Sequence, residues 1–192
     1  MSTRIVLLLA IAAASAGGCM APLAAGHREG TGGGTIAEQS ADRRFVEQAA
    51  RDGLAEVKLG ELAAGKASDP RVKSLARAML DDFRQIDDQL RRLAAAKGIA
   101  LPADLDARQR WDYEALDRLC CYEFNRYYTN MMADYLVKEV RRFRHARQGV
   151  ADPDIRRFAV LNVPVLRDQR ERAQALVPYF GHGRTDGGDT PQ

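Results

Sequence analysis

The chain has 192 residues and a net charge of +3, so its length suits one domain with tails, and its charge is too small to indicate nucleic-acid binding. Between residues 40 and 178, alanine, leucine, arginine, glutamate and aspartate dominate and β-branched residues are sparse. This composition is that of a globular protein rather than a disordered one, and it favours helices over strands.

The first residues, MSTRIVLLLAIAAASAGGCM, read as an export signal. Arg4 precedes an apolar run over residues 5–14 that is too short to cross a bilayer comfortably, and small residues follow it, as in a signal peptide. The ending SAGGC is similar to a bacterial lipobox, although Ala16 stands where leucine is usual. We therefore predict a lipoprotein-type signal peptide over residues 1–18 and a lipid on Cys19.

Plain secretion with cleavage near Ala25 is the alternative, and both readings predict export. Met20 is not the aspartate that often retains lipoproteins at the inner membrane, so we expect the outer membrane, facing the periplasm. Residues 19–40 are rich in glycine and small residues, and residues 179–192 have a similar composition. We predict a flexible tether and a disordered tail on either side of a helical domain over residues 41–178.

A first helix is predicted over residues 41–66. One face repeats at spacings of 4 and 3 and consists of Ala49, Gly53, Glu56, Gly60 and Ala63, as expected for a packed helix. Four of these five are tiny, so a neighbouring helix can approach closely. Glu56 places a carboxylate in the middle of that face.

A second helix opens with Asp69 as N-cap and Pro70 at its first position, and Gly98 closes it,. Phe83 lies on its apolar stripe and Asp82 lies at the edge of the stripe. A short helix is predicted over residues 106–119 and a third long helix up to about residue 147. A fourth opens at ADPDIRR and runs to about residue 177, with Pro164 expected to kink or loosen it.

Cys120 and Cys121 are adjacent, and a disulfide between neighbours is strained inside a helix. We predict two small buried hydrophobic residues, with a thiol redox sensor as the alternative. The aromatic residues Tyr122, Phe124, Tyr127, Tyr128 and Tyr135 are expected in the core.

Tight links after the first and third long helices predict two antiparallel hairpins, and the longer stretch between the second and third can act as a crossover. The pattern suits either a ferritin-like or an up-down four-helix bundle.

Four segments resemble the bacterial domain-of-unknown-function family numbered 4142. They are RFVEQAARDGLAEVKLGELAAGKASDPRVKSLARAMLDDF, KGIALPADLD, FNRYYTNMM and DPDIRRFAVLNVPVLRDQ, and the likeness covers about residues 42–177. The resemblance implies an all-α, ferritin-like four-helix bundle with a short extra helix in the crossover, and an exported protein. It implies no established activity. Typical members carry histidines where this chain has Phe83, Leu136 and Gln169, whereas Glu56, Asp81 and Asp82 match the family pattern. These departures predict loss of a polar interior.

The sequence offers little for a metal or a cofactor. A ferritin-like di-iron site needs Glu-x-x-His motifs, and the histidines are His27, His145 and His182, none of which lies on a core stripe. Glu56, Glu123, Asp82 and Asp134 could supply an all-oxygen site, although hard cations want six or more ligands. We expect no bound metal or cofactor, and Glu56 hydrogen-bonded to tyrosine or arginine across the bundle. A metal-binding bundle that uses Glu56 and Asp82 is the alternative.

No serine is paired with a histidine or lies in a nucleophile elbow. GTGGGT is not followed by the lysine and serine or threonine of a P-loop,. We therefore expect no enzymatic activity.

One positive feature is a basic run near the end of the third long helix. It contains Lys138, Arg141, Arg142, Arg144 and Arg147 around a single Glu139, and Arg156 and Arg157 follow nearby. Such a cluster at one end of the bundle can bind anionic lipid head groups or other envelope polyanions. Ordinary charged helix faces look similar. The sequence thus predicts a non-catalytic, lipid-anchored binding or structural module of the cell envelope.

Overall fold

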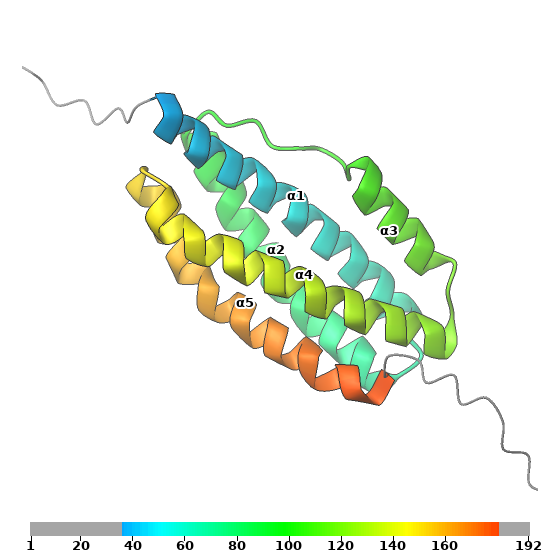
Figure 1. Ribbon diagram of the computed structural model, residues 1–192. Helices are drawn as coiled ribbons and strands as arrows, with labels where there is room; N and C mark the ends of the chain where they lie inside the picture. The colour runs from blue at the N-terminus through cyan, green and yellow to red at the C-terminus, as the bar shows by residue number, and fades with distance from the viewer. Residues whose placement is uncertain (1–35, 181–192) are drawn as a thin grey trace, which may run out of the picture. The chain divides into compact units, whose positions relative to one another are not determined.

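The computed structural model describes residues 36–180, which form five helices (Figure 1). They are α1 (Ile36–Lys66), α2 (Pro70–Ala96), α3 (Ala107–Asp117), α4 (Cys121–Gly149) and α5 (Pro153–Phe180). α1, α2, α4 and α5 form a bundle, and the short α3 lies outside it, beside α1 and α4. The predicted all-α, ferritin-like four-helix bundle with a short helix in the crossover is confirmed.

Four predictions lie wholly or mostly outside this range: the signal peptide over residues 1–18, the lipid on Cys19, residues 19–35 of the predicted tether and residues 181–192 of the predicted tail. Within that range, α1 begins at Ile36 rather than near residue 41, and α5 continues to Phe180.

Local signals explain where the helices begin and end. The Asp69 carboxylate accepts the backbone N–H of Arg71 at 2.8 Å, and Pro70 opens α2, as predicted. Gly98 follows α2 with a φ of +64°, a left-handed conformation that glycine adopts without strain. At α5, the Asp152 carboxylate accepts the N–H groups of Asp154 and Ile155 at 2.8 and 3.2 Å.

Contacts between distant residues fix the helix directions. Ser68, in the α1–α2 turn, and Asn125, near the start of α4, exchange two hydrogen bonds of 3.2 and 2.8 Å. At the other end, the carboxylate of Asp42 accepts the backbone N–H groups of Ala151 and Asp152 at 2.8 and 2.9 Å. The end of α1 therefore lies beside the start of α4, so these helices are antiparallel and the crossover makes α2 and α4 parallel.

The core follows the predicted stripes. Phe83, Leu136, Phe143 and Phe158 are buried, and a Cβ added to Gly60 would lie 3.6 Å from the Cβ of Leu80. Gly60 of the small face therefore lies close to α2, as the sequence predicted, whereas Gly53 of the same face has no atom within 4 Å of an added Cβ. α5 is continuous through Pro164. In the described range, no helix combines the length and apolar character that crossing a membrane requires.

The prediction for the cysteines is wrong. Cys120 and Cys121 are both exposed and free, because Cys120 lies in the turn between α3 and α4 and Cys121 is the first residue of α4. Cys120 is the N-cap of α4, and Cys121 has a φ of +56°. The break itself falls where the sequence predicted it, since the short helix was expected to end near residue 119; only the predicted burial of the two thiols is wrong.

Candidate functional sites

Two glutamates meet inside the bundle. Glu56 of α1 and Glu139 of α4 are 2% and 3% exposed, and their carboxyl groups are in hydrogen-bond contact. Burial raises the pKa of both, and the charge of Glu139 raises the pKa of Glu56 further. Two ionised carboxylates in contact are strongly disfavoured in a low-dielectric interior. The carboxyl pair therefore holds a proton, with Glu56 donating to Glu139.

This arrangement corrects the sequence reading of Glu56. Burial was expected, but the partner is a second carboxyl group rather than a tyrosine or arginine. Arg142 acts nearby: its guanidinium donates to Asp52, one turn from Glu56, and its charge opposes the rise in the pKa of both glutamates. Burial outweighs Arg142 at Asp52 too, so the pKa of Asp52 is raised.

A small polar cavity of about 150 Å³ adjoins the carboxyl pair between α1, α3 and α4. Gln109 of α3 closes part of it by donating to the carbonyl of Arg51 at 2.9 Å. The Glu139 Oε2 atom is buried and has no hydrogen-bond partner among the described residues. Glu56 and Glu139 both line this cavity.

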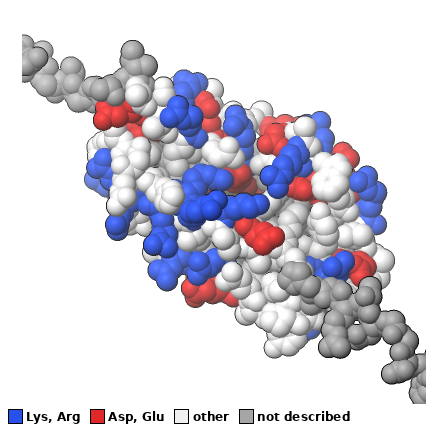
Figure 2. Space-filling view, in the orientation of Figure 1, with Lys and Arg blue, Asp and Glu red and all other residues white. Residues whose placement is uncertain are grey.

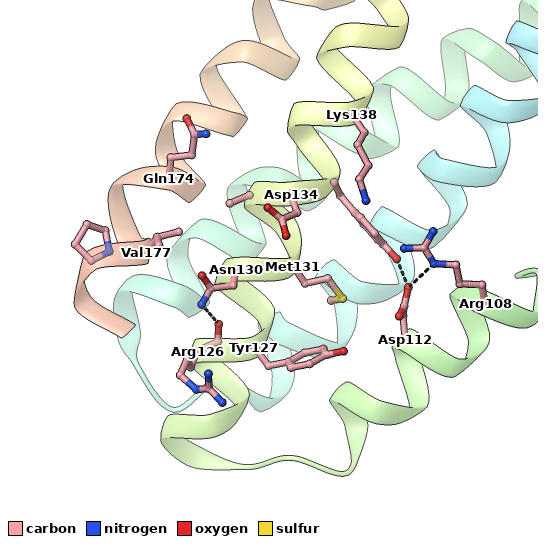
Figure 3. A pocket seen from close by; sticks show the side chains of 13 residues that line it. Arg108, Asp112, Arg126, Tyr127, Asn130, Met131, Asp134, Lys138, Gln174 and Val177 are labelled. Carbon is pink, nitrogen blue, oxygen red and sulfur yellow. Dashed lines mark hydrogen bonds and ion pairs between the residues drawn. The ribbon is translucent and has the colours of Figure 1, made fainter. Parts of the chain in front are cut away.

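A second hollow of about 660 Å³ runs over α4 between α3 and the end of α5. In Figure 3, Arg108 and Asp112 of α3 face α4, and dashed lines mark the contacts of Asp112 with Arg108 (3.9 Å) and with the hydroxyl of Tyr135. Burial and the hydrogen bond to Asp112 raise the pKa of Tyr135. Lys138 packs 5.9 Å from the ring centroid of Tyr135, which places this lysine on the α3 side of α4.

The carboxylates considered for a metal site do not assemble. Asp82 accepts a hydrogen bond from Gln169 on α5 and is not among the groups that shift the pKa of Glu56. Glu123 is exposed and pairs with Arg126 at 2.7 Å, and Asp134 is also exposed. Within residues 36–180, no three histidine, cysteine, aspartate or glutamate side chains form a group able to hold a metal ion.

The positions where the family usually has histidines are all interior. Phe83, Leu136 and Gln169 are at most 2% exposed. The interior nevertheless keeps polar contacts, between Gln169 and Asp82 and between Glu56 and Glu139. The predicted loss of a polar interior is therefore incomplete.

The predicted basic cluster is divided between two faces of α4. Arg142 turns inward to Asp52 and Lys138 faces α3, whereas Arg141, Arg144 and Arg147 line a groove between α4 and α5. Its volume is about 940 Å³. Arg167 and Arg170 of α5 join the three arginines of α4 there, and His145 lies beside them. We call this the arginine groove, and Figure 2 shows basic side chains gathered over α4 and α5 toward their connecting turn.

Few acidic side chains balance this charge. Arg141, Arg144, Arg147 and Arg167 have no ion pair with any residue in the described range. Arg170 pairs with Glu171 at 3.4 Å. Besides Gln148, the other residues that line the groove are apolar; they are Val137, Val140, Phe143, Val160, Val163 and Pro164.

Sequence reasoning missed three residues of these sites. Glu139 was assigned to the basic run, although it follows Met132 and Leu136 and precedes Phe143 at helical spacing, which places it on the buried face. Arg167 and Arg170 lie on another helix. Folding the α4–α5 hairpin about its turn would have placed both opposite the basic run.

Comparisons with known proteins give a family and a fold. A family model described as "Domain of unknown function (DUF4142)" matches residues 31–176. The chain is also similar to a crystal structure of a DUF305 fragment from Deinococcus radiodurans, with a TM-score of 0.64 and 14% sequence identity over 72% of this chain and 96% of that one. At this identity the likeness concerns the fold alone. No curated protein matches the chain.

Proposed function

The chain belongs to the DUF4142 family, a domain of unknown function, and we propose that this member is a non-catalytic module that binds phosphate-bearing anionic surfaces of the cell envelope through the arginine groove. One observation carries the proposal. Four arginines without an ion pair in the described range converge on one hollow between two helices. Guanidinium groups bind phosphate in a planar, bidentate manner, and clustered positive charge attracts anionic surfaces.

Charged helix faces often serve only solubility, and arginines without an ion pair in the described range, such as Arg77 and Arg92, also occur outside the groove; what separates the two readings is that four such arginines line one hollow. Elsewhere on the bundle, Arg84 pairs with Glu61 at 2.8 Å and Arg91 with Asp87 at 2.7 Å. Such pairs neutralise the surface. The groove instead leaves its charge unbalanced, since the nearby Asp168 pairs with Arg172 at 2.7 Å.

The non-catalytic part rests on the side chains available. His145, the histidine of the described range, is exposed on the groove. Ser68 is engaged with Asn125. These residues offer no hydrogen-bonded nucleophile and base of the kind that acyl transfer needs.

Export and lipid attachment complete the proposal. A lipid on Cys19 and a basic groove on the bundle are two separate membrane signals, and two are needed for stable anchoring. We infer an outer-membrane anchor that faces the periplasm. Labelled fatty acid should enter the wild-type protein in bacterial cells and disappear in Cys19→Ala. Equal labelling of both proteins would refute the anchor.

The groove is tested with unlipidated full chain carrying Cys19→Ser and with sedimentation of phosphatidylglycerol or phosphatidylcholine vesicles. Binding should require the anionic lipid and weaken as salt is added, because salt screens exposed charges. Each basic residue near an anionic surface contributes about 1 kcal/mol. Arg141→Glu with Arg144→Glu should therefore weaken binding at least about 30-fold.

The matched control is Arg77→Glu with Arg92→Glu. Both residues are exposed on α2, so the variant makes the same change in net charge away from the groove. It should retain most of the binding. Equal losses in the two double variants, or binding that salt leaves unchanged, would overturn the proposal.

A further inference from the structure

The arginine groove also carries an unusual share of exposed aliphatic surface. Six large hydrophobic side chains are exposed in the described range, and three of them are aliphatic: Val137 (44%), Val160 (44%) and Leu161 (64%). Val137 and Val160 line the groove, and Leu161 follows Val160 on α5. The other three are the aromatic residues Trp111, Tyr122 and Tyr179, none of which lines the groove. Exposed aliphatic groups and unpaired arginines therefore occur together.

This combination distinguishes between possible anionic partners. A soluble polyanion offers phosphates but no apolar phase, so contact with it would leave the aliphatic side chains in water. A bilayer surface offers both, with phosphates at the head-group level and acyl chains just beneath. Arginine side chains can keep their charged ends at the phosphates while their stems lie along apolar surface.

We propose that the partner of the arginine groove is the anionic bilayer itself, and that Val137, Val160 and Leu161 enter the boundary between head groups and acyl chains. The inference rests on the proposed function and names the partner of the same site. It also sets an orientation, in which α4 and α5 face the membrane and α3, with Trp111, lies away from the contact.

The backbone of α5 limits the depth of insertion. Pro164 lines the groove inside α5 and has no N–H, so it cannot donate the helical hydrogen bond to the carbonyl of Val160. A backbone carbonyl without a donor is costly in hydrocarbon. The contact is therefore shallow and stays in the hydrated interface.

Tryptophan fluorescence tests the insertion. A Leu161→Trp variant is made in a Trp111→Phe background, so that its single tryptophan reports on the exposed α5 surface next to groove residue Val160, with Cys19→Ser to remove the lipid. With phosphatidylglycerol vesicles, its emission should shift to shorter wavelength, and lipids brominated on the acyl chains should quench it. Trp111, which is 59% exposed on α3, should stay unshifted and unquenched in the Cys19→Ser chain.

The outcomes distinguish a failure of this inference from a failure of the proposed function on which it rests. Salt-sensitive vesicle binding without quenching at residue 161 would overturn the inference and leave the proposed function standing. Equal quenching at residues 111 and 161 would also overturn it, because the groove would not set the orientation. Absence of vesicle binding would overturn both.

A second variant measures the apolar contribution without a reporter. Val160→Ser with Leu161→Ser should weaken binding to phosphatidylglycerol vesicles about tenfold and leave binding to soluble polyphosphate unchanged, because the arginines remain. Trp111→Ser is the matched control and should change neither. Equal effects of the double serine variant on vesicles and polyphosphate, or no effect on vesicles, would refute insertion.

Discussion

Glu56 of α1 and Glu139 of α4 face each other inside the bundle, and their carboxyl groups share a hydrogen bond that requires a proton. Two helices far apart in the sequence therefore meet through a contact whose strength depends on pH.

The first prediction concerns that dependence. Burial raises the folded-state pKa of both groups above the ordinary value of 4.5. A carboxyl group with a raised pKa stabilises the fold fully below its unfolded-state value, and this stability is lost as the pH rises through the folded-state value. The free energy of unfolding should therefore fall as the pH rises above 4.5, the ordinary pKa of a glutamate. The fall is at most about 1.4 kcal/mol per pH unit for each proton released. Urea titrations from acidic to mildly alkaline pH measure this.

Glu139→Gln provides the decisive comparison, because an amide has nearly the same size and cannot ionise. The variant should show a flatter decline in stability with pH than the wild type. Glu61→Gln, at an exposed site on α1, the helix that carries Glu56, should keep the wild-type profile. A Glu139→Gln profile as steep as that of the wild type would contradict the assignment.

Local sequence signals predicted most of the fold, but of the Glu56–Glu139 pair they predicted only that Glu56 is buried. Asp69, Pro70 and Gly98 act over a few residues, so the limits of α2 follow from them directly. Glu56 stood out because its neighbours on the face are tiny. Glu139 did not, because the adjacent arginines suggested an exposed surface, although its spacing from Leu136 and Phe143 placed it inward.

The cysteines and the groove show a different limit. Cys120 and Cys121 are exposed at the break between α3 and α4; the sequence predicted the break near residue 119, but the position of the break did not show that both thiols face solvent. Arg167 and Arg170 join the basic run only through the pairing of α4 with α5. The periodicity of one helix does not show which charged side chains of a neighbouring helix pack beside it.

The second prediction concerns Asp42, whose carboxylate accepts two backbone N–H groups of the α4–α5 turn. Asp42→Ala should lower the free energy of unfolding by about 1–3 kcal/mol, since buried donors lose their acceptor. Asp154→Ala at the same end removes an exposed ion pair with Lys97 and should cost less than about 1 kcal/mol. Chemical denaturation compares the two variants. Equal losses of stability would contradict a stabilising role for the two hydrogen bonds that Asp42 accepts.

The third prediction tests the close approach of α2 to α1. Gly60→Leu should destabilise the protein by about 1–3 kcal/mol, because the added side chain must push Leu80 away. Gly53, on the same helix, has no atom within 4 Å of an added Cβ. Gly53→Leu should therefore be neutral or slightly stabilising, since glycine weakens a helix. A lower midpoint for Gly53→Leu than for Gly60→Leu in thermal unfolding would contradict the packing described.

The fourth prediction concerns thiol accessibility. In a full chain carrying Cys19→Ser, both Cys120 and Cys121 should react with a thiol reagent without denaturant, because both are exposed. Contact with Cys120 raises the pKa of the Cys121 thiol, so this cysteine should react slowly at neutral pH and faster as the pH rises. Cys120→Ser removes that contact and should speed the reaction of Cys121. A thiol that reacts only after unfolding would contradict the exposed turn.

The two hydrogen bonds that Asp42 accepts from the α4–α5 turn have a mechanical consequence. Tension applied along the chain from the N-terminal end of α1 reaches Asp42 within the first turns of that helix. From there it passes to the amides of Ala151 and Asp152, at the turn that joins the two walls of the arginine groove. A pull on the N-terminal end would therefore reach the arginine groove through the Asp42 carboxylate.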